Sequence, residues 1–168
     1  YERDVGGRAV ATTATTVLFA LAEPGEAADA RTGIGERYDR AVTAVRRALR
    51  GLGVAATRGE PPETYCPGDH SLQCDGKLVG LAQRVTTSGA LVSGVLYVDD
   101  RDELADVLTA VYAQLGYDFD PTSVGTVADA GGECRFERVK AEFTAQLTRA
   151  LDAPDGAVET INPGPQSG

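Results

Sequence analysis

Lys77-Leu78-Val79-Gly80-Leu81-Ala82-Gln83-Arg84, followed after a turn by Gly89-Ala90-Leu91-Val92-Ser93-Gly94-Val95-Leu96-Tyr97-Val98, is the stretch that decides the fold. Asp75-Gly76 stands directly before it, and an Asp-Gly pair ahead of an apolar run predicts a tight turn entering a strand. Thr87-Ser88-Gly89 predicts the turn between the two runs. We therefore expect a β-hairpin over residues 77–98.

Each expected strand of this hairpin has an interior glycine, Gly80 in the first and Gly94 in the second. Glycine inside a strand weakens it and often marks the close approach of a ligand or another backbone. Lys77, one of only two lysines in the chain, is expected at the mouth of the hairpin and outside the core. The pattern fits a sheet surface that forms the base of a ligand-binding site. It fits equally well a surface lysine on a hairpin with two bulges.

The composition limits the kind of protein. The chain has 168 residues and a net charge of −9, which is enough for one domain with a sizeable core. The acidic balance argues against nucleic acid as a partner, because such binding depends on basic patches. The longest apolar run near the start, residues 17–22, is strand-sized, so we expect no membrane partner and a cytoplasmic protein.

The cysteines do not predict a metal site. Cys66, Cys74 and Cys134 lack the paired spacing of zinc ligands, and the only histidine is His70. We expect free thiols and no structural metal. Cys66, Asp69 and His70 lie within five residues, which indicates either a polar loop or a Cys66–His70 catalytic pair.

Three helices are predicted by apolar residues at three- and four-residue steps, over residues 34–52, 100–115 and 135–151. Asp100 and Glu103 form a capping-box pattern for the second of them. Strands are expected at residues 15–22, 54–57 and 71–74, besides the hairpin. The predicted class is α+β, a mixed β-sheet with helices packed on it. The ordered domain covers residues 1–151, and the Pro/Gly-rich residues 152–168 are expected to be a disordered tail.

A glycine pair near the start is a further candidate for a binding role. Gly6-Gly7 is flanked by Arg3 and Arg8. Adjacent glycines let backbone N–H groups approach an anion, and arginine adds a fork of donors. The same residues could simply form a turn.

Four blocks of the sequence together resemble one family. Gly6-Gly7-Arg8-Ala9-Val10 resembles the R-R-x-G-G-G-A-V segment of lipoate–protein ligases, and Gly68-Asp69 resembles their N-D pair. Residues 77–84 are similar to their K-I-x-G-x-A-Q-R motif, and residues 93–96 to their H-G-x-L. The order and spacing agree over roughly residues 1–150. The chain thus resembles a biotin/lipoate A/B protein ligase catalytic domain of archaeal type.

This resemblance implies an enzyme that activates lipoate or octanoate with ATP and Mg²⁺ to an acyl-adenylate. The acyl group then passes to a lysine of a lipoyl domain in a 2-oxoacid dehydrogenase or glycine-cleavage protein. A separate accessory subunit is a further implied partner, because some relatives supply their C-terminal domain as a second polypeptide. Family members also have a portion before the glycine block, so we expect this chain to be an N-terminally truncated catalytic domain.

The resemblance assigns Lys77 the catalytic role. A compact ammonium can hold a phosphate and a polarised carbonyl and stabilise the charge that develops during acyl transfer. Asp69 is implied as a contact to Mg²⁺-phosphate or to the adenine side. The implied acyl-adenylate-binding residues are Arg3, Gly6, Gly7, Arg8, Asp69, Gly80, Ala82, Gln83, Ser93 and Gly94.

Four positions depart from the family pattern. Arg8 stands where the family has its third glycine, and Glu2-Arg3 where it has an arginine pair. Gly68 replaces the usual Asn, and Ser93 replaces the usual His. These departures bear on the substrate and the efficiency more than on the fold.

Two other readings remain open beside the ligase, which we favour. The first is an octanoyltransferase of the same fold that works without ATP through an acyl-thioester on Cys66, with Lys77 polarising the carbonyl. The second is a non-catalytic acyl-binding module whose catalytic set has decayed. The motif at residues 77–84 does not separate ligase from transferase, because both groups share it.

Overall fold

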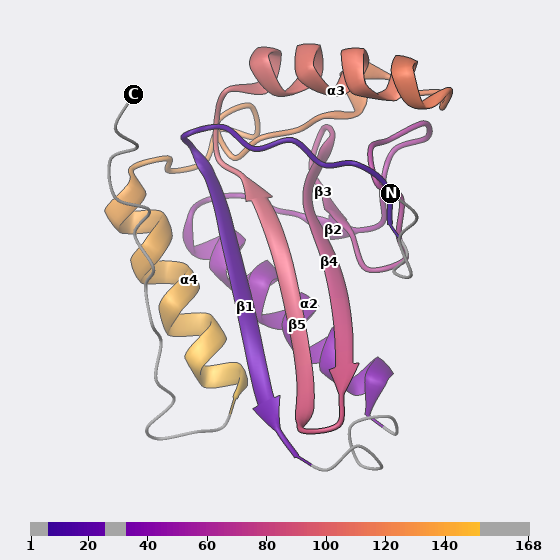
Figure 1. Cartoon of the computed structure of the whole chain (residues 1–168). Helices are drawn as coiled ribbons and strands as arrows, with labels where there is room; N and C mark the ends of the chain where they lie inside the picture. Colours follow the sequence, from indigo (N-terminus) through magenta and orange to yellow (C-terminus); the bar gives the residue numbers. More distant parts are fainter. Residues whose placement is uncertain (1–6, 26–32, 152–168) are drawn as a thin grey trace, which may run out of the picture.

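The computed structural model of this chain describes residues 7–25 and 33–151. The predicted tail at 152–168 lies outside the described residues, and so do Arg3 and Gly6. Figure 1 shows the sheet with its helices.

Within the described residues, five strands form one sheet in the order β1-β5-β4-β3-β2, and every neighbouring pair is antiparallel. A single parallel bridge joins Lys77 to Val124. The strands are β1 Thr16–Pro24, β2 Thr57–Arg58, β3 Leu72–Gln73, β4 Lys77–Thr86 and β5 Gly89–Tyr97. The helices are α2 Ile34–Gly51, α3 Arg101–Leu115, the 3-10 turn η1 Pro121–Ser123, and α4 Phe136–Ala150. The α+β class and the central hairpin are confirmed.

The turn before the hairpin depends on glycine. Asp75 and Gly76 both have positive φ, 50° and 130°, and such a conformation favours glycine at the second position. A Cβ atom at Gly76 would also lie 2.7 Å from the Cα of Gly125. Two glycines thus allow the backbone before Lys77 to touch the segment after η1, where Gly125 N–H donates to the Lys77 carbonyl at 3.1 Å.

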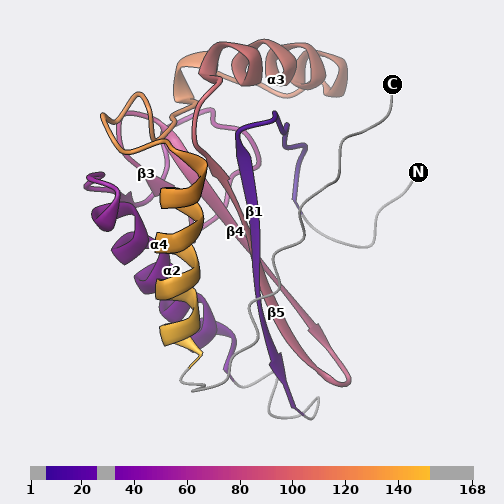
Figure 2. The same cartoon turned by 90° about the vertical axis from the view of Figure 1, so that its left-hand side faces the viewer.

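Helices α2 and α4 cover one face of the sheet, as Figure 2 shows. Side chains alternate between the faces of a strand, and in-register partners share a face. Phe19 of β1, Gly94 of β5 and Leu81 of β4 thus belong to the helix-covered face. The main core lies here, where strand residues such as Val92 and Leu96 pack with α2 and α4.

The opposite face, called here the open face, has no described helix along most of its length (Figure 2). It carries Leu18, Ala20 and Ala22 of β1, with Leu91, Ser93 and Val95 of β5 and Gly80, Ala82 and Arg84 of β4. At one end of the sheet, α3 covers a second apolar cluster that includes Val95, Tyr97 and Tyr112. The sheet therefore has a packed face and an accessible face, and the accessible face carries several small side chains.

Two local predictions were wrong. The capping box at α3 does not form: Asp100 takes a left-handed conformation, makes no capping bond with its side chain, and instead accepts a hydrogen bond from Thr15 Oγ1 at 2.8 Å. The strand expected at residues 54–57 is reduced to β2, which starts at Thr57. The N–H of Val54 instead donates to the Leu49 carbonyl of α2 at 2.8 Å.

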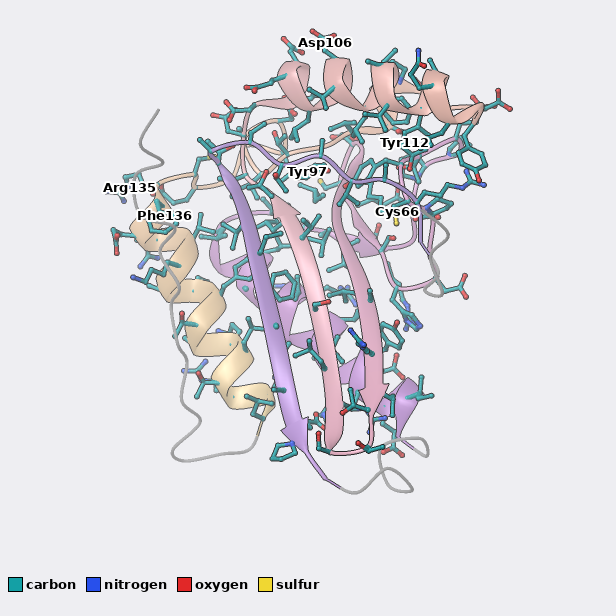
Figure 3. The ribbon with its side chains drawn as sticks, viewed as in Figure 1. Cys66, Tyr97, Asp106, Tyr112, Arg135 and Phe136 are labelled. Carbon is teal, nitrogen blue, oxygen red and sulfur yellow. The ribbon has the colours of Figure 1, made fainter. Side chains whose placement is uncertain are left out.

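The apolar stripes of two helices are narrower than the sequence indicates. Helix α3 buries Leu104, Leu108 and Tyr112, while Val107 and Val111 remain 45% and 36% exposed. The reason is that α3 rests on the end of the sheet along a single line of four-residue steps. Phe136 is an apolar residue of the helix predicted at residues 135–151, but it is the first residue of α4 and is 53% exposed (Figure 3). None of the described helices is long and apolar enough to cross a membrane.

Candidate functional site

Lys77 begins β4, and its backbone is fixed from two sides. Its carbonyl accepts from the Tyr65 hydroxyl and from Gly125 N–H, both at 3.1 Å. Its ammonium donates to the carbonyls of Tyr65 and Cys66 at 3.0 and 2.7 Å, and to Glu60 Oε2 at 3.0 Å. The lysine thus joins the hairpin to the loop over residues 60–66.

The expectation that Lys77 lies outside the core was wrong, because the residue is fully buried. The pairing between β3 and the start of β4 is irregular. At this point the Lys77 side chain is directed into the interior of the protein. Burial lowers the pKa of Lys77, and the hydrogen bond and charge of Glu60 oppose that shift. The ammonium remains close to the open face, since a Cβ atom at Gly80 would lie 4.0 Å from Nζ.

Glu60 is the counterion of Lys77. Its carboxylate also accepts from Gly68 N–H at 3.0 and 3.1 Å and from Ser71 Oγ at 2.8 Å. About a fifth of its side chain is exposed, against 1% of the Lys77 side chain. The Glu60 carboxylate thus accepts hydrogen bonds from an ammonium, an amide and a hydroxyl. These contacts hold the Lys77–Glu60 ion pair in place.

Cys66 lies next to this pair in a constrained backbone conformation. Its φ is +37°, in the left-handed region that disfavours residues with a Cβ. Its peptide N–H donates to the Tyr112 hydroxyl at 2.5 Å, and its Sγ accepts from Arg8 N–H at 3.3 Å. The thiol is half-buried and is held against Gly7 and Arg8. Figure 3 shows Cys66 beneath α3, beside Tyr112.

Buried tyrosines attach the first described residues to the rest of the site. The Tyr112 hydroxyl donates to the Ala9 carbonyl at 3.0 Å, and the Tyr97 hydroxyl donates to the Ala11 carbonyl at 2.9 Å. The Tyr65 ring stacks against Tyr97 at 5.2 Å between ring centroids. Burial raises the pKa of all three phenols, so they stay protonated and act as hydrogen-bond donors.

Gly7 and Arg8 are held beside Cys66. Gly7 has a φ of +104°, and a Cβ atom there would lie 3.6 Å from Cys66 Sγ. The Arg8 guanidinium lies over the Tyr117 ring, 4.1 Å from its centroid, an arrangement in which the cation is attracted to the ring face. Gly7 and Arg8 thus lie beside Cys66, which contacts Lys77 at one end of the sheet. Gly7 and Lys77 are 70 positions apart in the sequence.

The remaining motif residues divide between the two faces of the sheet. Gly80, Ala82 and Ser93 belong to the open face, where Ala82 is paired with Ser93. Gly94 belongs to the helix-covered face, where a Cβ atom would lie 2.3 Å from Phe19 Cζ and 2.7 Å from Leu81 Cδ2. The space above Gly94 is therefore filled by core side chains.

Gln83 also points to the helix-covered side. With its amide oriented to satisfy both ends, Gln83 donates to the Ile34 carbonyl at 3.1 Å and accepts from the Arg37 guanidinium at 2.8 and 3.0 Å. Arg37 is a buried residue of α2. These contacts connect β4 to the start of α2 and support a structural role for Gln83.

Asp69 and His70 lie in the loop between β2 and β3 and contact Arg58 of β2. The Arg58 guanidinium contacts both His70 Nδ1 and the Asp69 carbonyl. The His70 ring stacks on Tyr38 with 3.7 Å between centroids. In the described part of the chain Cys66 Sγ is bonded to Arg8 and not to His70, so the contacts do not support a Cys66–His70 pair. The Asp69 side chain is exposed.

Sequence reasoning missed Glu60, Tyr65 and Tyr112. Glu60 is 17 residues from Lys77 and stands in a Pro-rich loop, so no local pattern connects the two. Tyr112 had a usable signal, because it follows Leu104 and Leu108 at four-residue steps, and this spacing predicts that it is buried. Buried phenols need a hydrogen-bond partner, and here the partner is the backbone of the glycine block.

The fold described above is that of the catalytic domains of lipoate–protein ligases. A putative lipoate protein ligase from T. acidophilum with bound lipoic acid superimposes with a TM-score of 0.66 at 21% identity, covering 89% of this chain and 57% of that chain. A lipoate-protein ligase A bound with ATP gives a TM-score of 0.67 at 22% identity, with the same coverage. The bi-partite lipoate protein ligase of Thermoplasma acidophilum, studied with its E2 lipoyl domain, gives 0.65 at 19% identity, covering 96% and 60%.

The family model of the lipoyl protein ligase A/B catalytic domain matches residues 1–148. The chain therefore belongs to the lipoyl protein ligase A/B family. It spans somewhat less than two thirds of the length of the solved structures that it resembles. Comparison with curated proteins gave no significant match.

Proposed function

We propose that this chain is the catalytic domain of a lipoate/octanoate–protein ligase, which activates the acid with ATP and transfers the acyl group to a lysine of a lipoyl domain. The observation that carries the proposal is the position of the Lys77 ammonium, beside Gly80 on the open face and in contact with the Cys66 loop. Membership of the family and the bound lipoic acid and ATP of two similar structures support it.

The proposed chemistry has two steps. The acid's carboxylate attacks the α-phosphate of ATP, giving an acyl-adenylate and pyrophosphate. The ε-amine of the acceptor lysine then attacks the acyl carbonyl, AMP leaves, and the amine loses a proton. In both steps negative charge develops on oxygens, and a fixed ammonium in a buried setting stabilises such charge strongly. Lys77 fits this role through its burial and its fixed backbone.

The open face offers a surface for the acyl chain. Its side chains at Ala20, Ala82 and Ser93 are small. Leu18, 69% exposed, and Leu91, 38% exposed, belong to the same face. An octanoyl or lipoyl chain that covers them would remove apolar surface from water, at about 25 cal/mol per Å².

Nucleotide and Mg²⁺ binding have fewer candidate residues. Among the described residues, Arg8 and Lys77 are two candidate cations, and both contact Cys66 through hydrogen bonds. In proteins Mg²⁺ is usually held by one or two carboxylates together with substrate phosphates, so the exposed Asp69 fits as a single contact. Among the described residues no group of three or more His, Cys, Asp or Glu side chains gathers into a metal site. Asp69 stays the proposed contact to Mg²⁺-phosphate.

The ATP-independent transferase is the second candidate, and one observation favours it. The Cys66 carbonyl is 2.7 Å from Lys77 Nζ, while the Cys66 sulfur accepts from Arg8 N–H. In this reaction the Cys66 thiolate attacks an acyl-thioester and the carrier thiol leaves. The acceptor amine then attacks the Cys66 thioester and regenerates the thiolate.

The deciding experiment incubates a lipoyl domain with the protein and weighs the product by mass spectrometry. One reaction contains ATP with octanoate or lipoate, and another contains octanoyl-carrier protein without ATP. If the protein is a ligase, acylation should occur only in the first reaction, and the Cys66→Ala variant should be active. If the protein is a transferase, acylation should occur only in the second reaction, and the Cys66→Ala variant should be inactive. Acylation in neither reaction would contradict both proposals and favour an acyl-binding module.

A further inference from the structure

The ammonium of Lys77 has no free donor in this structure. An ammonium carries three N–H groups, and three acceptors surround it: the carbonyls of Tyr65 and Cys66 and the carboxylate of Glu60. The side chain is 1% exposed. An acyl group that binds to Lys77 must therefore replace one of these three acceptors.

The two carbonyl acceptors are hard to displace. Tyr65 is fully buried, stacks on Tyr97, and its hydroxyl holds the Lys77 carbonyl. The peptide unit of the Tyr65 carbonyl donates its N–H, that of Cys66, to the Tyr112 hydroxyl. The Cys66 carbonyl belongs to the peptide bond with Pro67, whose ring restricts the backbone on both sides of that bond. Moving either carbonyl would therefore require the backbone to move.

Glu60 is the acceptor that can be replaced. It contacts Lys77 through a flexible side chain, and it is about one fifth exposed. It also keeps three hydrogen bonds when the lysine leaves, two to Gly68 N–H and one to Ser71 Oγ. The carboxylate therefore stays satisfied and charged beside the ligand instead of moving away with the lysine.

We propose that Glu60 is a specificity-determining residue that weakens the binding of anionic acyl groups at Lys77 relative to neutral ones. This inference rests on the proposed function, in which Lys77 binds the acyl group. A carboxylate or phosphoryl oxygen competes with Glu60 for the ammonium and, once bound, lies near a second negative charge. A neutral carbonyl meets no such repulsion, because only like charges repel.

Isothermal titration calorimetry with two probes tests the proposal, octanoate as the anion and octanamide as its neutral counterpart. Glu60→Gln keeps the size of the side chain and an oxygen acceptor for Lys77 but removes the charge. We expect it to raise the affinity for octanoate about tenfold while leaving octanamide within about twofold, since the removed term is electrostatic. Glu63→Gln is the matched control: it removes the same charge from an exposed residue of the same loop and should change neither affinity.

Three results separate the possible failures. If both probes bind and Glu60→Gln leaves the ratio of their affinities unchanged, the specificity role is overturned while the proposed function stands. If neither probe binds, or if octanoate binds equally well to Lys77→Met, the proposed acyl site is overturned together with this inference. Glu60→Ala provides a second test should the glutamine variant not fold, and it too should raise the affinity for octanoate.

Discussion

The short motif at residues 80–83 contributes side chains to both the helix-covered face and the open face of the sheet, and the two sets have different roles. From Gly80 to Gln83, alternate residues of β4 face opposite ways. Leu81 and Gln83 pack toward α2 and α4, whereas Gly80 and Ala82 line the accessible side. A motif that reads as one continuous block in the sequence thus contributes one half to the core and one half to the proposed site.

The two glycines of the hairpin make this difference plain. The missing side chain of Gly94 leaves room for Phe19 and Leu81, while that of Gly80 leaves room only for the Lys77 side chain. Core packing explains the absence of a side chain at Gly94, and the position of the Lys77 side chain explains its absence at Gly80. Substitutions on the two faces should therefore separate stability from activity.

Lys77→Met has the largest expected effect, because Lys77 belongs both to the proposed site and to the packed interior. Acyl transfer should fall at least 100-fold, the scale on which lost electrostatic stabilisation acts. The fold should lose about 3 kcal/mol, since Glu60 loses its counterion and keeps only its hydrogen bonds to Gly68 and Ser71. Urea denaturation and the lipoyl-domain assay measure the two effects.

Two variants control this experiment. Lys140→Met removes the other lysine of the chain, half-buried on α4, and should leave acyl transfer unchanged. The double variant Lys77→Met/Glu60→Gln should recover stability without recovering activity. Activity near that of the wild type in Lys77→Met would disprove the assigned role.

Gly94→Ala comes next and should act on stability. The added methyl would meet Phe19 and Leu81 at distances that require the core to shift, and such overpacking costs about 1–3 kcal/mol. Thermal denaturation gives the loss. The activity of the folded fraction should be unchanged, and a selective loss of activity would place Gly94 in the site instead.

Gly80→Ala is the matched variant on the open face. Its methyl would contact Lys77 Cε at 3.6 Å, an ordinary van der Waals distance. Stability should change by less than about 1 kcal/mol, as for most substitutions without a clash. The lysine has less room to turn toward a ligand, so octanoate should bind several-fold more weakly by calorimetry. Equal binding would show that the acyl group does not enter beside Gly80.

Gln83→Ala tests the link from β4 to α2. The variant loses the hydrogen bonds to the Ile34 carbonyl and the Arg37 guanidinium. Bonds to a charged group contribute about 1.5–3 kcal/mol, so we expect a loss near the low end of this range because Gln83 is only half-buried. Denaturation in urea measures it. A loss of acyl transfer at unchanged stability would instead support the binding role that the family resemblance implies.

His70, which lies on neither face, should have the smallest effect. Burial, and then the charge of Arg58, lower its pKa below 6.5, so the folded chain takes up this proton less readily than the unfolded chain. Stability is therefore lost as the pH falls below about 6.5, where the unfolded histidine becomes protonated. His70→Phe keeps a ring for Tyr38 to stack on and should remove this part of the acid sensitivity. An NMR titration of the imidazole gives the pKa directly.

Much of the fold could be predicted from local signals. The Asp75-Gly76 turn, the hairpin and the 3.6-residue periods of α2 and α4 are local patterns, and the structure confirms them. The capping box at Asp100 failed because a tertiary partner, Thr15, competes for the same carboxylate. Local rules hold where no distant group competes.

The candidate site was predictable only in part. The motif spacing indicated Lys77, but neither its burial nor its pairing with Glu60 could be read from the sequence. That pairing needs a loop that ends in a left-handed Cys66 and is held by Tyr112. The Cys66–Tyr112 contact joins residues 46 apart and the Tyr112–Ala9 contact joins residues 103 apart, and no periodicity exists over such separations.

By itself, the sequence of this chain determined the order of the elements, the α+β class and the family motifs, because turn residues and apolar periods act over a few neighbouring positions. Only the tertiary structure decided which motif residues face the core and which face the open side. It also placed the ammonium of Lys77 inside the chain. The physical reason is that strand register and the pairing of buried charges are fixed when distant segments pack together.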